Sequence, residues 1–166
     1  MRDPDFPVRQ MMDQWAARRP DLDPRPMALF GRLTRADTLA NGAIAATLRA
    51  HGLNRGEFDV LATLYRGGEE MSAGALAGAL LLSPAATTNR LDRLQAAGLL
   101  ARLPDPEDGR GVRVRLTDAG RDLLKRSVED HVRGLESLLA LLSPDEREQL
   151  SALLARLLHS MAALRD

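Results

Sequence analysis

Apolar residues recur along most of this chain every three or four positions, the period of an α-helix with one buried face. The longest such pattern runs from about residue 26 to residue 51, and its inward positions are Phe30, Leu33, Ala40, Ile44 and Leu48. The same period predicts further helices at 8–19, from 54, from 72 to about 80, from 84 to about 97, after 117 and after 143. The chain is therefore expected to be mainly helical.

Residues that cap helices mark where these segments begin. Ser83 followed by Pro84 combines a favoured N-cap with proline at the first helical position, and Gly98 is a natural stop. Another short helix, capped by Ser72, ends about three residues before Ser83. Two short helices this close together form a helix-turn-helix pattern, which by itself is common in all-α proteins.

After residue 98 the pattern changes from helical to alternating. "LLARLP" (99–104) and "VRVRL" (112–116) are typical of strands, and "DPEDGRG" between them is typical of a hairpin tip. "RGGEEM" (66–71) is expected to be a loop. A hairpin directly after a helix-turn-helix predicts a winged helix. The expected fold class is therefore mainly α with a small β-hairpin wing (α+β), flanked by long N- and C-terminal helices.

Leucine-rich stripes dominate the last third of the chain. They are longer than a small winged-helix core needs, which favours a second copy of the chain as their partner. A homodimer would bring two winged helices together, whereas the alternative is that the stripes wrap the same monomer. The stripes comprise Leu123, Leu124, Val128, Val132, Leu135, Leu138, Leu139 and Leu142, then Leu150, Leu153, Leu154, Leu157, Leu158, Met161 and Leu164.

Composition excludes several classes of function. The 166-residue chain has no cysteine and three well-separated histidines, so we expect no disulfide, no thiol chemistry and no metal site. It contains no nucleophile paired with a base and no phosphate-binding glycine loop, so we expect neither an enzyme nor a cofactor. Acidic residues and prolines within the first seven positions interrupt any signal sequence, and no apolar run could span a membrane. A cytoplasmic protein without a membrane partner is expected.

Charge is zero overall but uneven along the chain. Residues 83–126 carry nine Arg or Lys against six Asp or Glu, a local net charge of +3. The predicted hairpin of residues 99–116 is called the finger below. Arginines on this finger are suited to bind a phosphate backbone, and polar side chains on the preceding helix are suited to contact base edges in a major groove. Asp108 is expected to hold an arginine in place, because phosphates repel a carboxylate. The candidate DNA-binding residues are Ser83, Thr87, Thr88, Asn89 and Arg93 on the helix, and Asp108, Arg110, Arg113 and Arg115 on the finger.

The segment "DGRGVRVRLTDAGR" (108–121) resembles the wing signature of the MarR family of transcription regulators: Asp, any residue, Arg, an alternating strand ending Leu-Thr, and a glycine three residues on. The resemblance implies one MarR-type domain over 1–166. An added N-terminal helix and connector would occupy 1–25, a winged helix-turn-helix 54–117, and dimerisation helices 26–53 and 118–166. It also implies a homodimeric repressor that binds double-stranded DNA at a pseudo-palindromic operator. The alternative is a winged-helix protein-interaction module without DNA binding.

Three segments resemble the urate-responsive PecS and HucR branch of that family: "QWAARRPDLDPRPM", "EFDVLATL" and "TNRLDRLQAAGLLARLPDP". In that branch one Trp, one Asp and two Arg carry the response to the effector, and the matching positions here are Trp15, Asp59, Arg90 and Arg102. The resemblance implies release from DNA by a small anionic aromatic ligand such as urate, with Asp59 and Arg90 paired in its absence. Each of the four residues also has a purely structural interpretation, so a different effector, or none, is the alternative.

Overall fold

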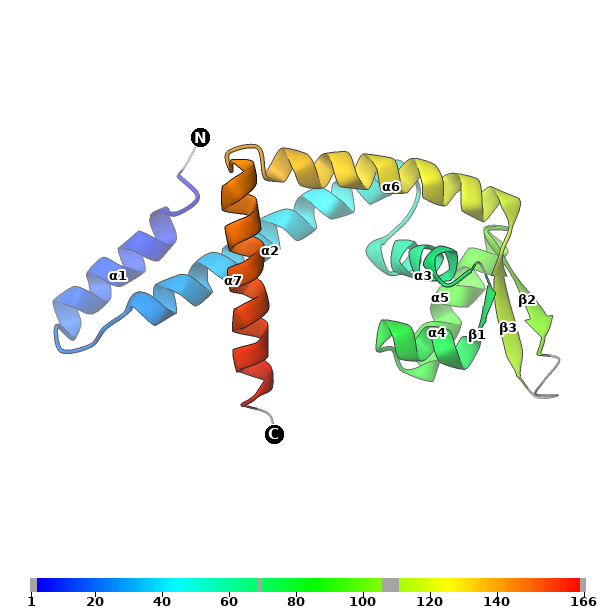
Figure 1. The fold of residues 1–166 in the computed structure, drawn as a ribbon, viewed down its shortest axis with the longest axis horizontal. Helices are drawn as coiled ribbons and strands as arrows, with labels where there is room; N and C mark the ends of the chain where they lie inside the picture. The colour runs from blue at the N-terminus through cyan, green and yellow to red at the C-terminus, as the bar shows by residue number, and fades with distance from the viewer. Residues whose placement is uncertain (1–2, 69, 106–110, 165–166) are drawn as a thin grey trace. The chain divides into compact units, whose positions relative to one another are not determined.

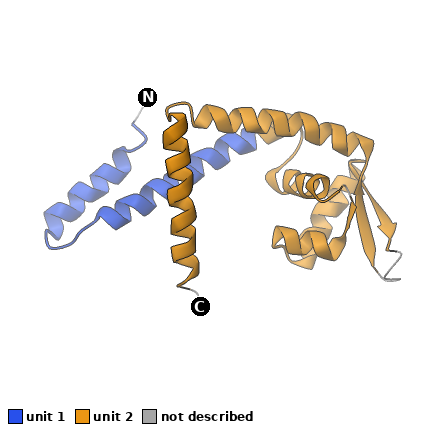
Figure 2. Cartoon of the chain, in the orientation of Figure 1, with its two compact units in different colours: residues 1–46 blue, residues 47–166 orange. Residues whose placement is uncertain are grey.

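The computed structural model describes residues 3–68, 70–105 and 111–164. Within these ranges the elements follow the order α1, α2, α3, β1, α4, α5, β2, β3, α6, α7 (Figure 1). The chain divides into two compact units, residues 1–46 and 47–166, with the boundary inside α2 (Figure 2). The predicted fold class, mainly helical with a small sheet, is confirmed.

The first unit consists of α1 (Phe6–Arg18) and most of α2 (Arg25–Ala50). The two helices approach closely, since Val8 of α1 is buried and its Cγ2 lies 3.6 Å from where a Cβ on Gly31 would stand. Ala28 is buried on the same unit, 1% exposed. Phe30, predicted to point inward, is 47% exposed, because short side chains rather than the ring form the contact with α1.

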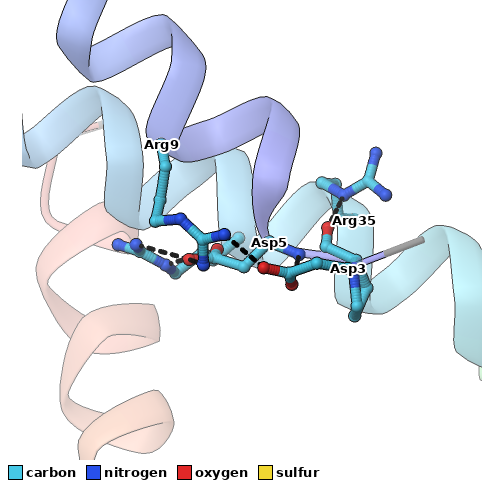
Figure 3. A network of polar contacts seen from close by, with 6 residues as sticks. Asp3, Asp5, Arg9 and Arg35 are labelled. Atoms are coloured by element: carbon cyan, nitrogen blue, oxygen red, sulfur yellow. Dashed lines mark hydrogen bonds and ion pairs between the residues drawn. The ribbon is translucent and has the colours of Figure 1, made fainter. Parts of the chain in front are cut away.

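An ion pair and a hydrogen bond to the backbone hold the N-terminal segment onto α2 within this unit (Figure 3). Arg32 donates through Nε and Nη2 to the two carboxylate oxygens of Asp5, at 2.9 and 3.1 Å. Arg35 donates through Nε to the carbonyl oxygen of Pro4 at 2.7 Å. The hydrogen bond from Arg32 is the main reason that the pKa of Asp5 lies below its ordinary value. Because these groups are exposed, the pairs orient the segment more than they stabilise the fold.

The second unit is built around α3 (Arg55–Arg66), which contacts α4 (Ala73–Leu80), α5 (Pro84–Ala96), α6 and the sheet. Figure 1 shows these short helices gathered beside the strands. Tyr65 of α3 is 41% exposed, because it borders an open groove between α3 and α6. The buried residues of α3 are Phe58, Val60, Leu61, Ala62, Thr63 and Leu64.

Helix starts in this unit agree with the capping residues of the sequence. Each cap side chain accepts a hydrogen bond from a backbone N–H three residues on, which satisfies one donor of the first turn. Two of them form complete capping boxes, with a glutamate returning the bond to the cap backbone. The capping residues are Asn54, Ser72, Ser83, Thr117 and Ser143.

The sheet has three strands, one more than the predicted hairpin. β2 (Leu100–Pro104) and β3 (Val112–Leu116) are antiparallel, and β1 (Glu70–Ser72) pairs antiparallel with the other side of β3. The prediction that 66–71 is entirely a loop is therefore wrong at its end. A strand of three residues is too short to show alternation, and its stability comes from a partner more than 40 positions away.

α6 (Asp118–Leu138) starts on the turn between α5 and β2. The hydroxyl of Thr117 donates to the carbonyl oxygen of Gly98 at 2.8 Å, and the backbone N–H of Thr117 donates to Leu99 at 3.2 Å. Gly120 is buried so close to this turn that a Cβ would stand 1.9 Å from the carbonyl oxygen of Leu99. The Leu-Thr-x-x-Gly part of the wing signature is thus a tight contact of helix backbone against turn.

The end of α2 packs on α6 within the second unit. Leu48 is fully buried, and Nε2 of His51 lies 2.8 Å from Oδ2 of Asp130. Arg133 first, and His51 second, lower the pKa of the Asp130 carboxyl from its ordinary value. This pair joins the helix before the winged helix to the helix after it.

The last helix, α7 (Pro144–Ala162), is described along its whole length and has no buried residue. Its leucines are among the most exposed large apolar side chains of the described chain, with Leu153 at 59% and Leu158 at 66%. No helix in the described part of the chain is long and apolar enough to cross a membrane.

Candidate nucleic-acid interface

α5 presents a polar face to solvent. Ser83 caps the helix through its Oγ, which accepts from the backbone N–H of Ala86 at 3.3 Å. Thr88, Asn89 and Arg93 lie on the following turns, and all three are exposed, as is Ser83 itself. Four of the five residues predicted to read DNA from this helix are therefore accessible.

Thr87 is the exception. It is 3% exposed, and its hydroxyl donates to the carbonyl oxygen of Ser83 at 3.0 Å. The residue lies four positions before Leu91 and seven before Leu94, both buried, so it belongs to the packing stripe of α5. The prediction that Thr87 faces DNA is wrong, because the backbone satisfies its polar atom inside the core.

The arginines of the finger differ in their surroundings. Asp108 and Arg110, predicted at the tip, lie outside the described residues. Arg113 is half-buried, and its Nε donates to Oε1 of Glu70 on β1 at 2.7 Å, so it helps to hold β1 against β3. Arg115 is exposed, on the face opposite to the buried Val114. Of these two arginines of β3, Arg115 is the more accessible to a phosphate backbone.

A groove of about 290 Å³ separates the start of α3 from α5. The guanidinium of Arg90 lies over Gly56: a Cβ there would stand 2.6 Å from Cζ of Arg90, and Nη1 donates to the Gly56 carbonyl oxygen at 3.5 Å. The expected ion pair between Asp59 and Arg90, both described residues, is not formed. Because Gly56 has no side chain, the guanidinium of Arg90 can pack directly against its backbone instead. The groove is lined by Asn54, Gly56, Glu57, Ala86, Asn89, Arg90 and Arg93.

Arg102 of β2 points onto α5. Its Nη1 donates to Oδ1 of Asp92 at 2.6 Å and to Oε1 of Gln95 at 3.0 Å, and its Nη2 donates to the carbonyl oxygen of Thr88 at 3.4 Å. Asp92 and Gln95 were not singled out from the sequence. Their spacing of three places them on one side of a helix, but only the sheet register shows that Arg102 faces that side.

The four predicted effector residues are divided between the chain's two units. Trp15 belongs to the first unit, on α1, and is 36% exposed. Asp59, Arg90 and Arg102 belong to the second, where Asp59 is half-buried on α3.

A further groove, of about 310 Å³, lies between α3 and α6 and was not predicted from the sequence. It is lined by Ala62, Tyr65, Arg66, Leu124, Lys125, Val128 and Glu129.

Comparison with known proteins agrees with this geometry. The MarR family model matches residues 51–111, which include α3, the helix-turn-helix and β2. PecS, an HTH-type transcriptional regulator from Dickeya dadantii (strain 3937), is 40% identical over 151 residues, covering 90% of this chain and 91% of PecS. The protein belongs to the MarR family. Its members are winged-helix transcription regulators that bind DNA.

Solved MarR family structures extend the likeness to the fold. A mutant MarR from E. coli complexed with operator DNA superposes with a TM-score of 0.71 at 26% identity, covering 81% of this chain and 96% of that one. BpsR from Bordetella bronchiseptica, whose DNA binding is regulated by 6-hydroxynicotinic acid, superposes with a TM-score of 0.67 at 29% identity, covering 78% and 97%. Nearly the whole length of each of these two chains is therefore matched by this MarR family protein.

Proposed function

We propose that this MarR family protein is a homodimeric repressor, bound to a pseudo-palindromic operator and released from it by a small anionic aromatic ligand. The observation that carries the DNA-binding part is the exposed polar face of α5, where Thr88, Asn89 and Arg93 are accessible; Arg115 of the finger is also exposed. A relative of 26% identity was solved on operator DNA, which supports the same use of this face.

Base reading and backbone binding fall to different residues in this proposal. Asn89 can bond to adenine in a bidentate manner, Arg93 can do so with guanine, and the methyl of Thr88 can contact that of thymine. Arg115, and Arg110 at the tip, supply charge to the backbone and to a narrow minor groove. A chain without net charge needs this division, because its overall field does not attract DNA.

Footprinting on the DNA that flanks its own gene would find the operator and test DNA binding directly. On that site, Asn89→Ala or Arg93→Ala should lower the preference over random DNA by roughly 1–3 kcal/mol at one base pair. Arg110→Ala and Arg115→Ala should weaken binding to both DNAs and reduce the salt slope by about one each. Arg49→Ala, an exposed arginine at the end of α2, serves as control. Equal losses on both DNAs for Asn89→Ala would contradict base reading.

The dimer in this proposal rests on the apolar faces of α6 and α7. Val128, Val132 and Leu138 are exposed on α6, and α7 has apolar residues along its length with none of them buried. Exposed apolar surface of this extent marks an interaction site. One recognition helix also contacts too few base pairs for operator specificity, whereas two related by a dyad match a pseudo-palindrome.

The effector part of the proposal rests on Trp15, Asp59, Arg90 and Arg102. PecS is a 40% identical relative, and the DNA binding of the similar BpsR responds to an anionic aromatic acid, which supports a ligand of that chemistry. Arg90 borders a groove and can leave the Gly56 carbonyl, since a bond of 3.5 Å is weak. An anion that competes for Arg90 would repel Asp59 and shift the position of α5. The groove between α3 and α6 is the competing location.

Trp15 is the only tryptophan, so its fluorescence should report ligand binding directly. Urate or 6-hydroxynicotinic acid should quench it and release the operator, and Arg102→Ala should keep the fold but lose the response. Lys125→Ala, in the groove between α3 and α6, should leave the response unchanged. If neither compound quenches Trp15 or releases DNA, the four residues are structural. If Lys125→Ala alone abolishes the response, the ligand binds in the other groove.

A further inference from the structure

We propose that Arg102, Asp92 and Gln95 form a clamp that sets the position of the recognition helix relative to the wing, with Arg102 as a positioning residue for DNA reading. The inference rests on the DNA-binding part of the proposed function and does not depend on any effector. These three residues are called the α5–β2 clamp below.

The clamp grips two turns of α5 with one side chain. Arg102 donates to Asp92, to Gln95 and to the backbone carbonyl of Thr88, at 2.6, 3.0 and 3.4 Å. These acceptors are spaced by four and three residues, so they form a single stripe along the helix. The Arg102 side chain is 27% exposed, less than the 57% of Asp92, so it reaches inward from the sheet edge toward that stripe.

On the strand side, the clamp is fixed by the sheet register. Arg102 is paired with Val114, which is fully buried, so this point of β2 is held against the core. Two residues later β2 ends at Pro104, before the predicted tip of the finger. The position that α5 takes at Arg102 therefore determines where the finger arginines lie relative to the helix.

On the helix side, the clamp stripe lies beside the reading stripe. Thr88, Asp92 and Gln95 form one row, and the next row contains Asn89 and Arg93, each one residue from a clamp contact. Rotation of α5 about its axis would move both rows together. The buried stripe of Thr87, Leu91 and Leu94 sets that rotation against the core. The three bonds from the planar guanidinium of Arg102 add a direct connection from α5 to β2.

An exposed ion pair contributes little to the free energy of folding, so stability is not the principal effect of the clamp. Its effect is to prepare helix and finger to contact DNA together, which removes an ordering cost from binding. The negative charge of Asp92 repels phosphates and by itself would weaken DNA binding, whereas its role in the clamp would strengthen DNA binding. The effect of removing Asp92 on operator affinity therefore distinguishes the clamp from a direct phosphate contact by Arg102.

A double-mutant cycle on operator affinity tests the clamp, using Arg102→Ala, Asp92→Ala and the double variant of the full chain. Each single variant should bind the footprinted operator about three to ten times more weakly, and the double variant no more weakly than either. The exchange Asp92→Arg with Arg102→Asp should recover part of the affinity. Thermal unfolding should change little in all of them. Asp122→Ala, an exposed acid on α6, is the matched control and should bind at least as tightly as wild type.

Other outcomes overturn the proposal in distinguishable ways. If Asp92→Ala strengthens binding and Arg102→Ala lowers the salt slope by about one, Arg102 contacts phosphate and the clamp is wrong. Additive losses in the cycle would also overturn it, while leaving DNA binding intact. If the wild-type protein binds no DNA at any site, both the clamp and the proposed function fail.

Discussion

Gly120→Ala is expected to lower the free energy of unfolding by about 3 kcal/mol, at the upper end of overpacking costs. The new Cβ would stand 1.9 Å from the carbonyl oxygen and 2.9 Å from the carbonyl carbon of Leu99, which are backbone atoms. Moving them would break the bonds that Thr117 makes to Gly98 and Leu99. Urea denaturation followed by circular dichroism measures the loss.

Gly78→Ala is the matched control for this change. Gly78 lies inside α4, and a Cβ there would meet nothing within 4 Å, so alanine should raise helix stability by about 0.5–1 kcal/mol. The two variants make the same chemical change in helices of the same unit and should move the unfolding midpoint in opposite directions. A Gly120→Ala protein as stable as wild type would show that the α6 start does not pack on the turn.

Leu153→Glu is expected to convert the dimer to a monomer and abolish operator binding. The wild type should sediment at roughly 36 kDa, twice the 18.1 kDa of one chain, and the variant at 18.1 kDa. Leu153 is 59% exposed within one chain, so the charge should cost little there, but in an apolar dimer interface it would be unpaired. Losing one of two half-sites should weaken operator binding by about a hundredfold or more.

Ala152→Glu provides the control for the dimer test. It adds the same charge one residue away on the opposite side of α7, where no leucine lies. This variant should remain a dimer and keep operator affinity. A wild-type protein that sediments as a folded monomer at micromolar concentration would contradict the two-half-site arrangement itself.

Local features of the fold could be predicted from the sequence, because their causes lie within a few residues. A cap residue satisfies donors three positions away, so the starts at Asn54, Ser83 and Thr117 are determined by nearby sequence. The hairpin of β2 and β3 follows from the alternation of residues 112–116, the apolar segment 99–104 and the turn-forming residues between them. β1 could not be found in this way, because a strand from 70 to 72 depends on pairing with β3 far along the chain.

Candidate site residues were harder to predict, because their roles depend on partners in three dimensions. Thr87 is polar but buried, since the carbonyl of Ser83 accepts its hydroxyl. Arg90 was expected to pair with Asp59, but its guanidinium lies against the backbone of Gly56, which has no side chain to exclude it. Residue type alone does not show whether an arginine such as Arg102 reaches solvent, a ligand or a neighbouring helix.

The exposure of α7 in a single chain makes DNA binding dependent on the concentration of the protein itself. An isolated helix of 19 residues is only marginally stable in water, and within one chain no residue of α7, all of it described, is buried. If a second chain covers its leucines, ordering α7 and pairing two chains become one equilibrium, subject to mass action. Below the dissociation constant of the dimer, α7 would fray and the paired recognition helices would separate. Cellular copy number would then govern promoter occupancy even before any ligand is present.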